Sequence, residues 1–317
     1  MTKAKGALFT THARFDLAGR AVELFLTRLL ARRSEQHVAE GLPPVAIFAF
    51  DYIGREIAVR GRFESDELNV LADFLRPLST RFASTVALDV GANIGNHSLF
   101  FAQRFGKVHA FEPNPRTFGL LKVNASLTDN IVVHNIGLGS IRGLASLNFN
   151  PLNVGEASLT PVQKGPMDVE IQIERLDDLS DQLGNVTFIK LDVEGFEPEV
   201  LAGAKTFLER FRPVVAFEQN PSAFIDGRSA AAELLVSMGY QLCILSRSEA
   251  GTGLLGRLVT TLRRLGQGVR YDVIAVETLA PGHYPMVIAL NEEDFGTLQG
   301  ATVTIHTPIS AHASAEQ

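Results

Sequence analysis

Cysteine is almost absent from this sequence of 317 residues, in which Cys243 is the only one. A single cysteine excludes an internal disulfide framework and a metal site built from several cysteines. Because it lies within the apolar run Leu242–Leu245, we interpret it as a small core residue and not as a nucleophile.

Long apolar runs and an excess of positive charge are also missing. No run approaches the roughly 20 apolar residues that a membrane-spanning helix needs, and Met1–Thr11 lacks the apolar segment of a secretory signal. The net charge of −6 provides no positive field to attract nucleic acid or an anionic membrane. We therefore expect a cytoplasmic protein with no nucleic-acid partner and no stable membrane insertion, and we leave a homo-oligomer open.

A hydrophobic fraction of 46% is enough to form a sizeable core. We divide the chain into an N-terminal accessory region (1–80), a main domain (81–280) and a C-terminal extension with a disordered tail (281–317). In the accessory region, apolar residues at helical spacing predict a helix over Arg14–Arg33. The runs Val45–Phe50 and Arg55–Arg60 suggest a hairpin, and a further helix is predicted from Ser65 to Pro77.

The main domain alternates short apolar runs with helical patterns, which is typical of βαβ units. This rhythm predicts an α/β fold with a doubly wound, mostly parallel, seven-stranded sheet. The seven runs are Val86–Val90, Val108–Phe111, Ile131–His134, Thr187–Leu191, Val214–Phe217, Leu242–Leu245 and Asp272–Val276.

Two segments depart from this rhythm. The runs Ala145–Phe149 and Val169–Ile173 predict an inserted hairpin with a long loop. Within this loop, Asn153–Ser158 is a candidate lid over a bound substrate. The segment Gly251–Arg270 places arginines among leucines and predicts a basic amphipathic surface helix.

The first strand of the main domain runs into a glycine-containing turn. Ligands of parallel α/β sheets bind at the carboxyl ends of the strands, and here Asp89 is followed by Gly91, Asn93 and Gly95. Gly91 permits a tight turn, and Gly95 lets the next helix pack closely on the strand. A dinucleotide fingerprint needs glycine where Asn93 stands, which argues against NAD or FAD.

S-adenosylmethionine fits this turn better, because it presents an amino acid and not a phosphate. Asp89 and Asn93 are placed to meet its ammonium and carboxylate. Glu112 ends the second strand, 23 residues after Asp89, where a carboxylate can accept hydrogen bonds from both ribose hydroxyls. Gly137 and Leu138 follow the third strand, where an adenine ring would lie. The predicted cofactor site also includes Asn96, Pro113 and Asn114.

Four strings of the sequence together resemble the FkbM family of methyltransferases. The resemblance implies a class I methyltransferase fold, S-adenosylmethionine as donor, and O-methylation of a sugar or polyketide hydroxyl. It also suggests that Phe63 and Glu64 face the pocket. The strings are Ala87–Pro115, Val133–Gly139, Glu174–Leu179 and Phe188–Ala204.

The acceptor side is predicted from the ends of the next two strands. Asp192 is our first choice for orienting the acceptor or acting as general base, with a helix cap as the equally weighted alternative. His97 and Glu218 complete the predicted catalytic group. Asp192, Glu218 and Asn220 would also offer oxygen ligands to Mg²⁺, but we favour a metal-free polar pocket.

Four other functions compete with small-molecule O-methylation. N-methylation needs less help from a base, and a non-catalytic protein of this fold would bind the cofactor without turnover. Asn93 argues against an NAD-dependent oxidoreductase. A nucleic-acid methyltransferase is disfavoured by the acidic balance and by Asp192-Val193-Glu194-Gly195, which stands where such enzymes carry an Asn/Asp-Pro-Pro-Tyr/Phe motif.

Overall fold

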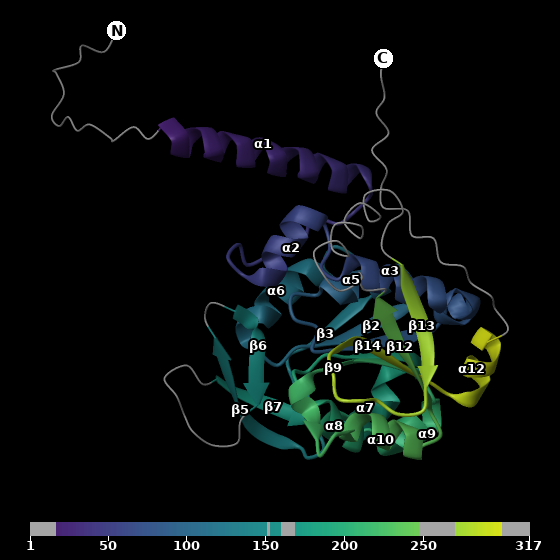
Figure 1. Ribbon diagram of the computed structural model, residues 1–317. Coiled ribbons are helices and arrows are strands. Elements are labelled where there is room, and N and C mark those ends of the chain that lie inside the picture. Colours follow the sequence, from purple (N-terminus) through teal and green to yellow (C-terminus); the bar gives the residue numbers. More distant parts are fainter. Residues whose placement is uncertain (1–16, 151–152, 160–168, 248–269, 300–317) are drawn as a thin grey trace, which may run out of the picture.

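The computed structural model describes residues 17–150, 153–159, 169–247 and 270–299. A central eight-stranded sheet runs in the order β13-β12-β14-β9-β8-β1-β2-β3, with helices above and below it (Figure 1). The strands from β3 to β9 in this order are parallel, whereas β14 is antiparallel to both of its neighbours. The predicted doubly wound, mostly parallel sheet is therefore confirmed, although it has eight strands and not seven. The strands are β1 (Val86–Val90), β2 (Lys107–Phe111), β3 (Ile131–His134), β8 (Val186–Leu191), β9 (Val214–Gln219), β12 (Gln241–Arg247), β13 (Tyr271–Val276) and β14 (Tyr284–Leu290).

The eighth strand, β14, was not among the seven predicted runs. It belongs to the segment assigned to the C-terminal extension, and it inserts between β9 and β12. Pro285 made this run a poor strand candidate, because proline cannot donate to a sheet ladder. The structure accommodates Pro285 at a register shift between Tyr284 and Val287.

The core lies on both faces of the sheet, because successive residues of a strand point to opposite sides. Phe188 packs on one face, whereas its neighbours Ile189 and Leu191 pack on the other. One face is covered by α7 (Leu176–Leu183), α8 (Glu197–Ala202), α9 (Lys205–Phe211) and α10 (Ala230–Ser237). The other is covered by α3 (Ser65–Phe74), η1 (Arg76–Leu78), α4 (Ser79–Phe82), α5 (Asn96–Ala102) and α12 (Glu292–Gln299), while α6 (Pro115–Ala125) packs against β2.

The accessory region contains no hairpin in its described part, which corrects that prediction. The run Arg55–Arg60 belongs to helix α2 (Tyr52–Arg60). Asp51 caps this helix by accepting a hydrogen bond from the backbone N–H of Ile53, and Gly61 ends it in a left-handed conformation. A cap and a stop residue that enclose nine residues favour a helix over the two short strands from which the hairpin was predicted.

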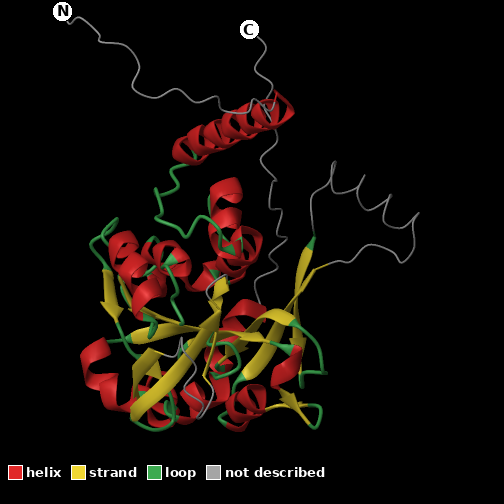
Figure 2. Cartoon of the chain, turned by 90° about the vertical axis from the view of Figure 1, so that its left-hand side faces the viewer, coloured by secondary structure: helices red, strands yellow, loops and turns green. Residues whose placement is uncertain are grey.

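The first helix is confirmed as α1 (Leu17–Ala39), and none of its residues is buried. It stands apart from the body of the molecule in both views (Figures 1 and 2). Within the described ranges, neither α1 nor any other helix combines the length and the hydropathy that crossing a membrane requires.

A second sheet of four strands lies beside the central one, in the order β4-β7-β5-β6. The predicted pair of runs is confirmed as the antiparallel pair β5 and β7. The proposed lid loop Asn153–Ser158 is instead part of strand β6, which pairs with β5. The strands are β4 (Gly137–Leu138), β5 (Gly143–Asn150), β6 (Asn153–Leu159) and β7 (Val169–Glu174).

A few short elements complete the fold, and three of the sequence predictions concern residues that the structure does not describe. The 3₁₀ turn η2 (Pro221–Ala223) leads to the two-stranded sheet of β10 (Phe224–Ile225) and β11 (Arg228–Ser229). The basic segment Gly251–Arg270, apart from its last residue, lies outside the described residues. The N-terminal residues 1–16 and the C-terminal tail from residue 300 also lie outside them.

Candidate active site

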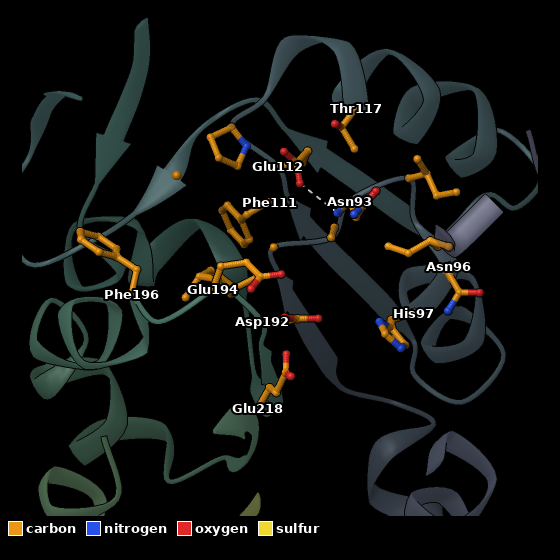
Figure 3. Close-up of a pocket in the computed structure, with 18 of the residues that line it drawn as sticks. Asn93, Asn96, His97, Phe111, Glu112, Thr117, Asp192, Glu194, Phe196 and Glu218 are labelled. Atoms are coloured by element: carbon orange, nitrogen blue, oxygen red, sulfur yellow. Dashed lines mark hydrogen bonds between the residues drawn. The ribbon is translucent and has the colours of Figure 1, made fainter. Parts of the chain in front are cut away.

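A cavity of about 280 Å³ opens at the carboxyl ends of β1, β2, β8 and β9 (Figure 3). The accessory region closes one side of it through Tyr52, Ile53, Phe63 and Glu64. Ten of the predicted site residues line this cavity, and three do not: Asp89, Gly95 and Asn114. The ten are Gly91, Asn93, Asn96, His97, Glu112, Pro113, Gly137, Leu138, Asp192 and Glu218.

The glycine turn is shaped by a close backbone approach. Gly91 has a φ of +80°, and a Cβ atom there would lie 1.8 Å from the carbonyl oxygen of Asp192. The N–H groups of Gly91 and Ala92 both donate to the carbonyl of Phe111. Only glycine fits this position, so the turn joins the ends of β1, β2 and β8 into one surface.

Glu112 is a buried carboxylate held by the backbone. Its Oε2 accepts a hydrogen bond from the N–H of Asn93 at 2.9 Å, and its Oε1 accepts one from the N–H of Asn114 at 2.8 Å. Burial raises the pKa of Glu112 to about 7, although these two hydrogen bonds act in the opposite direction. Each oxygen retains capacity for a ligand hydroxyl.

Asp89 lies behind the pocket wall and not on it. It is fully buried, and its Oδ2 accepts a hydrogen bond from Ser98 Oγ at 2.5 Å. The direct contact with a cofactor ammonium predicted for Asp89 therefore has no support from the cavity lining. Gly95 and Asn114, the other two predicted residues that do not line the cavity, lie at helix ends. Gly95 is the N-cap of α5, and the Asn114 side chain caps α6.

Asp192 forms an ion pair with a lysine from the same strand. Lys190 Nζ lies 2.8 Å from Asp192 Oδ2, and the Lys190 side chain is only 7% exposed. Burial alone would raise the pKa of Asp192, but Lys190 holds it below its usual value. The capping alternative is wrong, because α8 begins at Glu197 and the Glu197 carboxylate accepts from the local N–H groups. A paired carboxylate of low basicity suits orientation of an acceptor better than proton removal.

Glu218 faces Asp192 from the neighbouring strand end (Figure 3). Burial, followed by the charge of Asp192, raises the pKa of Glu218 to about 8. Glu218 therefore carries a proton at neutral pH and can donate a hydrogen bond to Asp192. The two carboxyl groups thus differ in protonation although they lie side by side.

His97 reaches the pocket from helix α5 (Figure 3), and Glu64 lines the same cavity next to it. His97 Nε2 lies 3.1 Å from Glu64 Oε2. Burial would raise the pKa of Glu64, but the contact with His97 and the charge of Lys190 lower it overall. Glu64 holds a left-handed backbone conformation with φ of 52°, which is uncommon for a side chain of this type.

The Asn96 side chain tethers the Glu64 loop to α5. Its Oδ1 accepts from the N–H of Phe63, and its Nδ2 donates to the carbonyl of the same residue, both at 3.0 Å. Only the family resemblance pointed to Phe63 and Glu64, because a tertiary contact between residues 33 apart leaves no local pattern.

No group of three or more His, Cys, Asp or Glu side chains suited to a metal ion occurs among the described residues. Asp192 and Glu218 share the cavity, but Asn220, the third ligand considered for Mg²⁺, does not line it. Outside the pocket, His109 Nδ1 and His134 Nε2 lie 2.9 Å apart, so these two histidines satisfy each other within the fold.

Comparisons with known proteins find methyltransferases. Residues 89–242 match the model of a family described as the methyltransferase FkbM domain. The chain is 29% identical over 192 residues to Methyltransferase sdnD of Sordaria araneosa, covering 49% of this chain and 73% of that protein. It is 33% identical over 133 residues to Hexuronic acid methyltransferase AglP of Haloferax volcanii (41% and 54% covered). It is 29% identical over 150 residues to 2-O-methyltransferase NoeI of Sinorhizobium fredii (40% and 60% covered). The chain thus spans less than two thirds of the latter two proteins.

Proposed function

We propose that the protein is an S-adenosylmethionine-dependent O-methyltransferase, a proposal that starts from the match of residues 89–242 to the methyltransferase FkbM domain. Its acceptor would be a hydroxyl group of a sugar or another small molecule. Two relatives whose printed names refer to a hexuronic acid and to 2-O-methylation support this acceptor class.

The observation that carries the proposal is the setting of Glu112. This buried carboxylate sits at the end of β2, beside the Gly91 turn, with both oxygens fixed by backbone N–H groups. A pair of ribose hydroxyls would find two aligned acceptors there. The lining residues Gly137 and Leu138 offer a small and apolar surface for an adenine ring.

When bound near Glu112 and the Gly91 turn, S-adenosylmethionine would supply the methyl group for transfer to the acceptor oxygen. The chain must then orient the acceptor hydroxyl and remove its proton. Asp192 accepts a hydrogen bond from the acceptor, and Glu218 in its protonated form donates one. His97 takes the hydroxyl proton, because Glu64 next to Nε2 favours the tautomer whose lone pair is on Nδ1.

Calorimetric titration with S-adenosylmethionine, S-adenosylhomocysteine and NAD tests the cofactor part of the proposal. We expect binding of the first two compounds and none of NAD. Transfer of a labelled methyl group to a pool of glycosidic and polyketide hydroxyls then tests turnover. Binding of the cofactor without transfer to any hydroxyl or amine acceptor would favour a non-catalytic protein, and binding of neither sulfur compound would contradict the proposal.

A further inference from the structure

The described residues that line the pocket carry acids but no strong base. Five carboxyl side chains face the cavity, whereas none of its described lining residues is lysine or arginine. The five are Glu64, Glu112, Asp192, Glu194 and Glu218. In Figure 3, Asp192 and Glu218 lie at the end of the cavity opposite Glu112.

Four groups are gathered closely at this acidic end. Glu64, Lys190, Asp192 and Glu218 together line a second, very small cavity beneath the main one. Lys190 is the only cation among them, and its Nζ is already engaged by Asp192 at 2.8 Å. Because Lys190 contributes no surface to the main cavity, an incoming ligand meets the carboxyl groups and not the ammonium.

We propose that Glu64, His97, Asp192 and Glu218 form an acceptor subsite that takes an uncharged polyol and excludes acceptors bearing a carboxylate, sulfate or phosphate. This inference rests on the proposed function and refines its acceptor class, because it keeps the sugar but sets this chain apart from the relative that is named for a hexuronic acid. The hydroxyls of a neutral sugar donate hydrogen bonds to Glu64 and Asp192, and the protonated Glu218 donates to a sugar oxygen. An anionic acceptor would face these like charges, and no lysine or arginine among the described lining residues could pair with it.

The subsite also requires the accessory region. Glu64 reaches it from the loop that the Asn96 side chain holds through Phe63, and Tyr52 and Phe63 pack edge to face at the same rim. Aromatic side chains next to carboxylates suit a sugar ring, which presents apolar C–H faces and polar hydroxyls. Discrimination by charge would therefore depend on a residue outside the matched domain.

A matched pair of acceptor pools tests this inference. The full-length protein with labelled S-adenosylmethionine is given neutral methyl glycosides, or the corresponding methyl uronosides that differ only in the C6 carboxylate. Binding of both pools to the protein loaded with S-adenosylhomocysteine is followed by NMR. We expect kcat/KM for the neutral pool to exceed that for the uronosides by at least about tenfold.

The variants Glu64→Gln and Asp192→Asn each remove a negative charge from the subsite, so they should reduce this ratio at least about threefold, whatever their effect on the absolute rate. Glu209→Gln, an exposed position on α9, should leave it unchanged. Uronosides used as well as neutral glycosides would overturn the inference, as would a ratio that neither variant alters. If neither pool binds or accepts methyl while S-adenosylhomocysteine binds normally, the subsite is wrong and the cofactor site stands. Loss of cofactor binding itself would instead contradict the proposed function.

Discussion

The two ends of the pocket are built in different ways. The cofactor end comes from consecutive residues that follow β1 and β2, and backbone groups fix its key carboxylate, Glu112. The acceptor end gathers side chains from α5, β8, β9 and the loop before α3, and ion pairs hold them together. Under the proposed function, local backbone geometry would therefore define cofactor binding, whereas tertiary packing would define what is methylated.

The largest expected effect is at the glycine turn. Gly91→Ala would place a methyl group 1.8 Å from the Asp192 carbonyl in a backbone conformation with φ of +80°, so both ends of the pocket should be lost together. We expect cofactor affinity to fall at least about 100-fold with a lower Tm. The matched control is Gly119→Ala, because a Cβ there has nothing within 4 Å and alanine favours the helix. Wild-type affinity in Gly91→Ala would contradict this description of the turn.

The next largest effect should be confined to the cofactor end of the pocket. Glu112→Gln keeps the shape of the side chain but removes its charge, so each hydrogen bond from a ribose hydroxyl loses strength. We expect affinity for S-adenosylhomocysteine to fall about 10- to 100-fold, in line with about 1.5–3 kcal/mol for hydrogen bonds to a charged group. Turnover at saturating cofactor should change much less. Calorimetry and initial rates on the same preparation make this comparison.

The raised pKa of Glu112 also predicts that cofactor affinity and protein stability change with pH. With a pKa near 7 in the free protein, the ionised form that accepts hydroxyl hydrogen bonds grows from pH 6 to pH 8, and wild-type affinity should rise about tenfold. The sign for stability is opposite. The folded state holds this proton more tightly than the unfolded state, so the contribution of Glu112 to stability decreases as pH rises from about 4.5 to 7. Both dependences should be weaker in Glu112→Gln.

At the acceptor end, Glu218→Gln mimics the protonated carboxyl group. Since the pKa of Glu218 is raised to about 8, the wild type should lose this hydrogen-bond donor above pH 8 and the variant should not. We expect the ratio of variant to wild-type kcat/KM to increase above pH 8, with cofactor affinity unchanged within about twofold. A pH-independent ratio would show that Glu218 does not titrate during turnover.

The smallest effect is expected for the tether of the accessory region. Asn96→Ala removes two hydrogen bonds to Phe63, so the Glu64 loop should lose its position while the cofactor end remains. We expect KM for the acceptor to rise about three- to tenfold. Asn130→Ala also removes two backbone contacts, but away from the pocket, and it controls for general destabilisation. A weaker cofactor affinity in Asn96→Ala would instead assign Asn96 to the cofactor end, as its position in the sequence predicted.

The sequence predicted most of the central sheet, because buried parallel strands are short apolar runs separated by helical patterns. It failed where a tertiary contact overrode the local pattern. Strand β14 contains Pro285, which the sheet tolerates only through a local register shift. The expected hairpin before Arg60 is helix α2, because Asp51 and Gly61 cap it at both ends.

The site shows the same division. Gly91 and Glu112 carry backbone requirements that are visible in a linear pattern, and both line the pocket. Asp89 belongs to the same pattern, yet its side chain is turned into the core and bound by Ser98. The contact between Glu64 and His97 could not be inferred, because it depends on how separate segments pack. The ion pair of Lys190 with Asp192 joins residues two apart, whose side chains point to the same side of a strand, and this spacing was overlooked.

The most direct test of the two-ended pocket is the dissociation constant of S-adenosylhomocysteine, measured by calorimetry for the wild type, Glu112→Gln and Glu218→Gln at pH 8. The account predicts tight binding by the wild type, at least tenfold weaker binding by Glu112→Gln, and binding within about twofold of the wild type for Glu218→Gln. Unchanged affinity in Glu112→Gln, or an equal loss in both variants, would contradict it.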